Sequence, residues 1–319
     1  MKHCTWIFAL VLAAAAAEQA ADMPQRDVAG VAAARDCVAG LDRKKVDGLY
    51  LASTTLPFAD RLNAGVVATA LNLRPDIATA DFASTLKGAT TALVSALDAA
   101  RNGKQTLVAA ADQRLARAGS FYEMWFGDGA ASLLIGDRDV ITEFEGAHSV
   151  SYDFVGHYRA ADHRFDYTWE ERWIREQGYA QIIPEAVNGL LDKMGIGIGD
   201  VDKIVYPCPF KREHADIGKA LGAQPGQLAD TMHEVCGETG AAHPLVMLVQ
   251  ALQEAEPGQR LLVASFGQGC DALCFRVTGK LRKLPARHGI KGSLAERRPV
   301  DQYLKFLKFR GLVETESGI

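Results

Sequence analysis

Basic charge is not in excess in this sequence. Its 319 residues contain 35 Lys and Arg against 39 Asp and Glu, which gives a formal net charge of −4 at pH 7. A nucleic-acid-binding protein needs surplus positive charge to neutralise phosphates, so the composition argues against that class. The one basic cluster, KLRKLPARHGIKGSLAERR, comes late in the chain and is typical of a solvated tail.

Cysteine is scarce, with six residues in the whole chain. A disulfide-stabilised scaffold of this length would need many more. No Cys-x-x-Cys pair occurs, and the late pair spaced four apart has no histidine companion, so the sequence predicts no metal site. We expect reduced thiols in a cytoplasmic protein at Cys4, Cys37, Cys208, Cys236, Cys270 and Cys274.

Long apolar runs are also rare, and the only one lies at the N-terminus. MKHCTWIFALVLAAAAAEQAADMPQ has a basic start, about a dozen apolar residues and an exit of small residues, as a signal peptide does. The run is too short to span a bilayer comfortably, so no membrane association is expected. We interpret residues 1–26 as a signal-like or aberrant segment. The domain then either lacks its first strand or takes that strand from this run.

Helix and strand patterns alternate from residue 27 onward, which predicts an α/β protein. The series occurs twice. VDGLYLAS in the first half corresponds to VDKIVYPC in the second. GATTALVSALDAARNGKQTLVAAA corresponds to GAAHPLVMLVQALQEAEPGQRLLVAS, and FGDGAASLLI corresponds to FGQGCDALCF. Because strand, helix and glycine keep their order in each pair, we infer a duplication with a pseudo-twofold axis. The two halves are placed at residues 27–146 and 179–280.

Two segments fit neither half. Residues 147–178 are rich in aromatic and charged side chains, and we expect an insertion that covers a site. His163 reaches a pocket if this insertion folds over it, whereas Asp162, Arg164 and Asp166 are typical of a surface ion network. Residues 281–319 are interpreted as a C-terminal extension or linker that docks a partner.

Five stretches, in this order along the chain, resemble the thiolase superfamily, and within it most closely 3-hydroxy-3-methylglutaryl-CoA synthase and ketoacyl synthase III. ADFASTLKGATTALVSALDAA is similar to their nucleophile segment, and FGDGAASLLIG to their glycine-rich hairpin. DKIVYPCPFKREHADIGKALG is similar to their histidine segment, VCGETGAAHPLVMLVQAL to their Gly-Asn segment and SFGQGCDALCFRVTG to their closing hairpin. The resemblance implies a duplicated thiolase-like fold, two pseudo-symmetric α-β-α halves with mixed five-stranded sheets, layered α-β-α-β-α.

The resemblance also implies acyl transfer and Claisen-type condensation of CoA thioesters, with the thioester as substrate or ligand and no separate cofactor. In that chemistry a cysteine at a helix N-terminus is the nucleophile, since the helix dipole favours the thiolate. The cysteine position falls on Leu86, or on Thr85 with one residue of slippage. The family's histidine falls on Pro207, and the asparagine that follows it falls on Phe210. The family's glutamate falls on Thr54, and the asparagine of the second half falls on Glu238. These positions define the expected pocket.

The internal repeat supports this alignment. If Gly88 pairs with Gly240, then Leu86 pairs with Glu238, so the two helix N-termini face each other. Leu86 cannot act as a nucleophile, and Pro207 cannot move a proton. The family's cysteine–histidine route is therefore closed to this chain.

Four polar residues near these positions remain candidates for chemistry. Glu238 lies just before a helix, where a carboxylate either caps N–H groups or serves as a catalytic or ligand group. Cys236 and Cys208 are each either a small buried hydrophobe or a nucleophile. His243, in the first turn of the same helix, is either a packed histidine or a base.

Three functions stay open. The replaced positions favour a non-catalytic subunit of an acyltransferase complex, as a homodimer or with a thiolase and a zinc-ribbon/OB-fold protein. The second function is an active acyl-CoA condensing enzyme with a non-standard site around Glu238. The third, a secreted non-enzymatic protein, is suggested by the N-terminus alone. CoA thioesters are cytoplasmic, which favours the first two.

Overall fold

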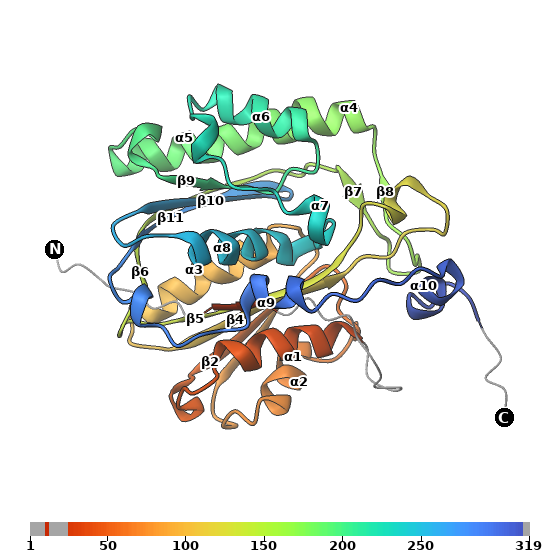
Figure 1. Ribbon diagram of the computed structural model, residues 1–319, viewed down its shortest axis with the longest axis horizontal. Coiled ribbons are helices and arrows are strands. Elements are labelled where there is room, and N and C mark those ends of the chain that lie inside the picture. The colour runs from red at the N-terminus through yellow and green to blue at the C-terminus, as the bar shows by residue number, and fades with distance from the viewer. Residues whose placement is uncertain (1–9, 13–24, 315–319) are drawn as a thin grey trace.

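The structure, a computed structural model, describes residues 10–12 and 25–314. Its elements stack in five layers, helices and sheets alternating, as Figure 1 shows. The first half of the chain supplies the lower sheet of that view and the helices beneath it, and the second half supplies the upper sheet and the helices above it. The middle layer takes one long helix from each half. This is the layered α-β-α-β-α arrangement predicted from the sequence.

The first sheet has five strands in the order β1-β5-β4-β2-β3. Strands β2, β3 and β4 are parallel, and β5 and β1 run antiparallel to their neighbours. The bounds are β1 Leu10–Leu12, β2 Gly48–Ser53, β3 Ala78–Ala83, β4 Thr106–Gln113 and β5 Asp128–Ile135.

The second sheet repeats this order with one strand fewer, as β6-β11-β10-β9. Within the residues described, the place of a fifth strand beside β9 is held by a single parallel bridge between Ile204 and Leu228. Two sheets of five were expected, so the second repeat is reduced at the edge that precedes Glu238. The bounds are β6 Thr142–Ser151, β9 Lys203–Val205, β10 Arg260–Phe266 and β11 Gly269–Val277.

The helices flank the sheets in pairs. The outer pairs are α1 (Gln25–Cys37) with α2 (Asn63–Ala70), and α5 (Ala180–Met194) with α6 (Lys211–Ala220). The middle pair is α3 (Gly88–Ala100) with α8 (His243–Glu254). Shorter helices are α4 (Glu171–Trp173), a π-helix (Ile174–Tyr179), α7 (His233–Cys236), α9 (Gly289–Ala295) and α10 (Tyr303–Phe309). Single 3₁₀ turns span Arg43–Lys45, Phe121–Glu123, Ile198–Asp200, Pro225–Gln227, Gly240–Ala242 and Leu281–Lys283.

The largest core cluster lies in the middle layer, between the two sheets. Helix α3 presents buried alanines and leucines on one face, and α8 is buried along most of its length. Small side chains let a helix approach a sheet and a second helix closely, which explains the composition of GATTALVSALDAA. Packing of α3 against α8 brings the N-termini of the two helices to the centre of the molecule.

Strand β1 comes from the apolar run at the N-terminus and pairs antiparallel with β5. The run therefore supplies the first strand of the sheet. Residues 1–9 and 13–24, which carry Cys4 and the rest of the signal-like pattern, lie outside the described residues. Among the residues described, no helix has the length and apolar character needed to cross a bilayer.

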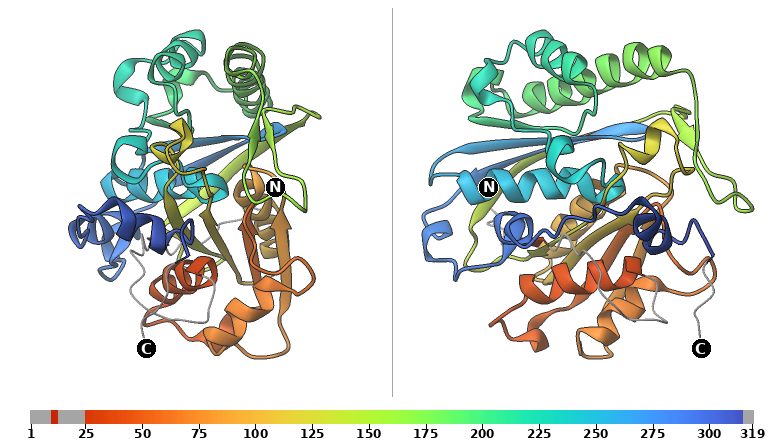
Figure 2. Two further views of the ribbon diagram at one scale, coloured as in Figure 1. Left: turned by 90° about the vertical axis from the view of Figure 1, so that its right-hand side faces the viewer. Right: turned by 45° about the vertical axis from the view of Figure 1, so that its right-hand side comes forward.

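The expected boundary at residue 146 falls inside β6, because β6 pairs with β11 from Thr142 to Ser151 and so belongs to the second sheet. After β6 the chain forms a cap, here residues 152–179. The cap contains a two-stranded hairpin of β7 (His157–Tyr158) and β8 (Tyr167–Thr168), then α4 and the π-helix. Figure 2 shows that this hairpin and α10 both lie at one end of the layered core.

Candidate functional site

The turn between β3 and α3 holds the position expected for a nucleophile. Ser84 starts the turn with a φ of +68°, and the Thr85 hydroxyl donates to the carbonyl of Gly267 at 2.6 Å. A Cβ placed on Gly267 would lie 2.6 Å from the amide nitrogen of Lys87 and 2.9 Å from that of Leu86. The turn and the loop between β10 and β11 therefore pack backbone to backbone. Thr85 is held by its hydrogen bond, and Leu86 presents only an aliphatic side chain.

Glu238 occupies the pseudo-symmetric position in the second half. Its amide donates to the carbonyl of Trp125 at 2.7 Å, and its carbonyl accepts from Gly127 at 3.0 Å. Its carboxylate Oε1 accepts from the amide of Gly240 at 2.9 Å, which is the capping contact proposed from the sequence. Oε2 forms an ion pair with Arg114. The carboxylate is therefore bound at both oxygens.

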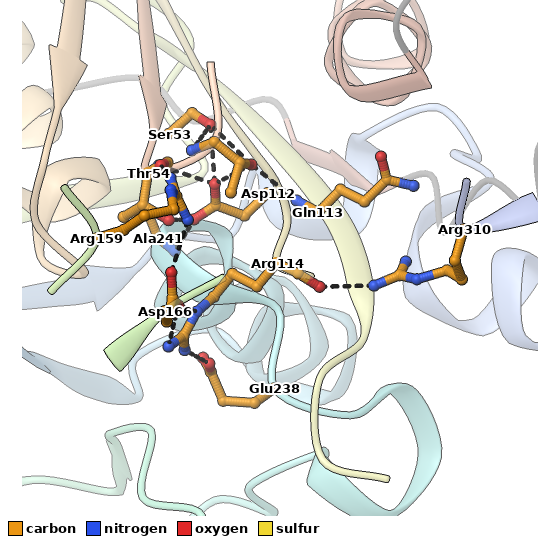
Figure 3. Close-up of polar contacts among 11 residues, drawn as sticks. Ser53, Thr54, Asp112, Gln113, Arg114, Arg159, Asp166, Glu238, Ala241 and Arg310 are labelled. Carbon is orange, nitrogen blue, oxygen red and sulfur yellow. Dashed lines mark hydrogen bonds and ion pairs between the residues drawn. The ribbon is translucent and has the colours of Figure 1, made fainter. Parts of the chain in front are cut away.

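Arg114 is the centre of a buried ionic network that joins the core to the cap (Figure 3). Its guanidinium binds Glu238 on one side and Asp166 on the other, the latter at 2.8 Å. Asp166 also pairs with Arg159 at 2.7 Å, and Arg159 donates to the carbonyl of Thr54. The Arg114 guanidinium lies 4.0 Å from the centre of the Phe126 ring.

This network corrects the sequence interpretation of the insertion. Asp166 was expected in a surface ion network, but its side chain is only 5% exposed because the cap folds onto the core. His163 and Asp162 do form an exposed pair, 2.9 Å apart. Arg114 and Arg159 were not predicted at all, since a single arginine in a loop carries no local signal of burial.

The charges of the network set the ionisation of Glu238. Burial acts to raise the pKa of Glu238, but the positive charge of Arg114 and smaller contributions from nearby groups outweigh it, so the pKa lies below its usual value. Glu238 is therefore an anion at neutral pH. An ionised carboxylate held by a guanidinium is a poor general acid.

Asp112, at the end of β4, is a second buried carboxylate that the sequence analysis missed. It accepts from the Ser53, Thr54 and Thr55 hydroxyls at 2.7–2.9 Å, from the Thr54 amide at 2.8 Å and from the Ala241 amide at 2.6 Å. Gly240, with a φ of +60°, leaves no room for a Cβ, which would lie 2.2 Å from this carboxylate. Asp112 thereby fixes the end of β2 against the start of the turn leading into α8 (Figure 3).

Three of the five expected family positions converge, but on very little space. Leu86, Pro207 and Glu238 line one small cavity of about 10 Å³, together with Tyr179 and Phe266. A cavity of that volume holds about one water molecule. Phe210 does not line this cavity, and its ring packs against those of Trp125 and Tyr179, with centres 5.3 Å and 5.9 Å away.

A larger cavity of about 300 Å³ lies on the other side of Leu86, under the cap. Thr54, Ser84 and Leu86 line it from the core, and His157 and Arg159 line it from the cap. Thr54 is thus separated from the small cavity that holds Glu238. The insertion therefore covers a cavity of the core.

The thiol candidates are not activated. Burial raises the pKa of both Cys208 and Cys236 to about 12. Cys208 donates to the carbonyl of Phe210 at 3.5 Å, and Cys236 to that of Met232 at 3.2 Å. Both thiols are free and protonated at neutral pH, as a structural cysteine is.

His243 is a packed histidine. Its Nδ1 lies 3.1 Å from the Thr239 amide and its Nε2 lies 2.7 Å from the Thr231 carbonyl, so both ring nitrogens are engaged. Its ring stacks on His233 at 4.1 Å between centres, and burial lowers the pKa of His243. No group of three His, Cys, Asp or Glu side chains in the part of the chain described is arranged to hold a metal ion.

Comparison with known proteins bears on this geometry. Residues 191–277 match the family described as 3-oxoacyl-[acyl-carrier-protein] synthase III C terminal. Hydroxymethylglutaryl-CoA synthase of Methanopyrus kandleri is 27% identical over 287 residues, covering 88% of this chain and 82% of the relative. The synthase of Methanocaldococcus jannaschii is 28% identical over 302 residues, covering 92% and 87%. The chain is thus similar in sequence to hydroxymethylglutaryl-CoA synthases and, over residues 191–277, to the synthase III family.

Solved structures of the superfamily share the fold. MvaS in complex with 3-hydroxy-3-methylglutaryl coenzyme A superposes with a TM-score of 0.80 at 19% identity, over 98% of this chain and 93% of that one. The 3-oxoacyl-(acyl carrier protein) synthase III of Pseudomonas aeruginosa PAO1 gives 0.74 at 20% identity, over 86% and 98%. By sequence similarity the chain is hydroxymethylglutaryl-CoA synthase-like, which confirms the resemblance inferred from the five sequence stretches.

Proposed function

We propose that this thiolase-superfamily chain is a non-catalytic, hydroxymethylglutaryl-CoA synthase-like subunit of an acyltransferase complex. One observation carries the proposal. The cavity of about 10 Å³ between the two central helix N-termini is lined by Leu86 and Pro207 and by Glu238, whose carboxylate is bound to Arg114. That cavity lacks the volume for a thioester, and Leu86 and Pro207 provide no group that could attack one.

The chemistry of the surrounding groups supports this reading. Covalent acyl transfer needs a nucleophile and a base within hydrogen-bond reach of each other. Thr85 donates its hydroxyl to a backbone carbonyl, and the thiols of Cys208 and Cys236 are kept protonated by burial. Both ring nitrogens of His243 are engaged. None of these four groups is therefore in a state to start the reaction.

Strand β3 suggests how the subunit meets a partner. It lies at the edge of the first sheet, where β2 is its one neighbour among the described strands. An edge strand offers unpaired N–H and C=O groups to a strand of another chain. In the proposed complex, β3 pairs with a second copy or with an active thiolase, a zinc-ribbon/OB-fold protein completes the assembly, and the partner carries the CoA thioester chemistry in the cytoplasm.

The larger cavity is the observation that favours the alternative, an active condensing enzyme with a non-standard site. Its volume of about 300 Å³ is enough for a small acyl group, and Ser84 and Thr54 are hydroxyl groups in its wall. In this alternative Glu238 must act on a ligand in the larger cavity, although Leu86 lies between that cavity and the small one that Glu238 lines.

Intact-mass measurement after incubation with acetyl-CoA separates the two proposals. We expect no acyl adduct on the wild-type chain and co-purification of a thiolase from the native host. A stable adduct that disappears in Cys236→Ser or in Ser84→Ala would establish the active-enzyme alternative. A lone homodimer in the native host would count against the complex but not against the missing chemistry.

A further inference from the structure

A polar cleft of about 410 Å³ lies between the core, the cap and the C-terminal segment; it shares Arg159 with the larger cavity beside Leu86 and no residue with the small one. Basic side chains dominate its wall: Arg159, His163 and Arg164 from the cap, and Arg310 from the end of α10. Gln113, at the end of β4, adds a side-chain amide. Three segments distant in sequence therefore direct cationic groups into one concave space.

The positive charge of the cleft is not balanced by acidic side chains in its wall. None of the residues that line the cleft is acidic. Asp166, Asp128 and Asp162 pair with Arg159, Arg310 and His163, but none of these carboxylates lines the cleft. Concave sites lined by one sign of charge concentrate the electrostatic field and attract counter-ions.

Arg164 carries the clearest unmet charge. The guanidinium of Arg164 donates to the carbonyl of Gly311, and its central carbon, Cζ, lies 5.7 Å from the centre of the Phe165 ring. Neither partner is an anion, and within the described residues no carboxylate comes within ion-pair distance of Arg164. An oxyanion in the cleft would supply the missing partner, since guanidinium groups bind such ligands through paired charge-assisted hydrogen bonds.

The arginines that flank Arg164 are held in position before any ligand binds. Arg310 donates to the backbone carbonyl of Arg114 at 2.6 Å and pairs with Asp128, and its side chain is 11% exposed. Arg159 is fixed by Asp166 and by the Thr54 carbonyl. Figure 3 shows Arg310 and Arg159 reaching toward the chain around Arg114 from opposite sides. Groups ordered in advance lose little entropy on binding.

We propose that this cleft binds a small, multiply charged phosphate group, either free or carried on a larger molecule. The site lies outside the small cavity of the proposed function and does not depend on whether that cavity is catalytic. Its ligand joins Arg164 of the cap to Arg310 of the C-terminal segment, and so fastens that segment to the core.

Titration calorimetry of the full chain with inorganic pyrophosphate, at constant ionic strength set with sodium chloride, tests the site. We expect saturable binding of one pyrophosphate per chain. The double variant Arg164→Gln/His163→Gln is expected to weaken this binding about tenfold or more, because it removes charge-assisted hydrogen bonds. Both residues are exposed, so the variant should fold, and its melting temperature checks this.

Arg138→Gln is the matched control, since Arg138 is 75% exposed, lies in the β5–β6 turn and does not line the cleft. Competition by CoA would identify the phosphates of a nucleotide as the ligand, and absence of competition would identify free phosphate or pyrophosphate. Pyrophosphate binding that is absent in the wild type, or equal in the wild type and in the double variant, would overturn the proposal.

Discussion

Arg114 and Glu238 form an ion pair buried between the two halves of the chain. Arg114 follows β4 of the first half, and Glu238 precedes the turn that leads into α8 of the second. Their side chains are 6% and 11% exposed. Breaking such a pair is costly because the charge left behind has neither water nor a partner. The pair therefore fixes the position of Glu238 and stabilises the contact between the two halves of the chain.

Replacing Arg114 by Ala should lower the free energy of unfolding by about 3–5 kcal/mol, because Glu238 is then left buried without a counter-charge and Asp166 keeps only Arg159. Urea unfolding measures the change. Arg172→Ala, which removes an exposed arginine, is the control and should change stability little. The double variant Arg114→Met/Glu238→Met should recover part of the loss. Equal stability of the two arginine variants would contradict the burial of the network.

A thiol introduced at Leu86 should be more reactive than the natural ones. Leu86→Cys places sulfur beside the N-terminus of α3 and in the wall of the larger cavity, where a thiolate is favoured. Cys208 and Cys236 have a pKa raised by burial to about 12. We expect iodoacetamide at neutral pH to modify the new cysteine about tenfold faster or more. Peptide mass mapping checks the site, with Leu86→Ser as the background. Equal rates at all three thiols would mean that the turn no longer favours a thiolate.

Gly267 should tolerate no side chain. A Cβ at Gly267 would lie 2.6 Å from the Lys87 amide nitrogen. Gly267→Ala must therefore push the β10–β11 loop away from the turn between β3 and α3. We expect a loss of about 1–3 kcal/mol in the free energy of unfolding. Gly279→Ala is the matched control, because a Cβ at Gly279 meets nothing within 4 Å. The two variants would unfold alike if the turn and the loop were not packed together.

Buried histidines should make the fold sensitive to mild acid. Burial lowers the pKa of His214 to about 4 and that of His233 to about 3, from 6.5 in the unfolded chain. Between pH 4 and pH 6.5 these histidines bind more protons in the unfolded state than in the folded state. Their contribution to the free energy of unfolding is therefore complete above pH 6.5 and is lost as the pH falls toward 4.

For His214 the loss is on the order of 2 kcal/mol between pH 6.5 and pH 4. His214→Asn should reduce the slope of the unfolding free energy against pH relative to the wild type. Thermal melts over this pH range provide the measurement. A slope that His214→Asn does not alter would show that this histidine is accessible to protons in the folded state.

The repeat was predictable because its signals are local. VDGLYLAS and VDKIVYPC form the equivalent strands β2 and β9, and the small-residue helix beginning at Gly88 packs beside its counterpart α8. The loss of the fifth strand in the second sheet was not predictable. It depends on how Leu228 meets Ile204, and neither residue differs in type from those of a regular strand.

The polar site was predictable only in part, for a related reason. Glu238 and its capping contact with Gly240 follow from adjacent sequence. Arg114 and Asp166 do not, because in the sequence they are single charges in polar loops, 124 and 72 residues from Glu238. Asp112 gave one usable signal, a carboxylate at the end of an otherwise apolar strand. Its role became visible only once β2 and the turn before α8 were brought against it.

The sequence by itself determined which chemical groups are missing at the two family positions, Leu86 and Pro207. Leucine has no nucleophile and proline has no proton to move, whatever surrounds Leu86 and Pro207, because those limits are covalent. The tertiary structure decided what Glu238 is: an anion bound to Arg114, beside a cavity with room for about one water. Burial, ionisation and cavity volume arise from groups that only folding brings together, and so no single stretch of sequence contains them.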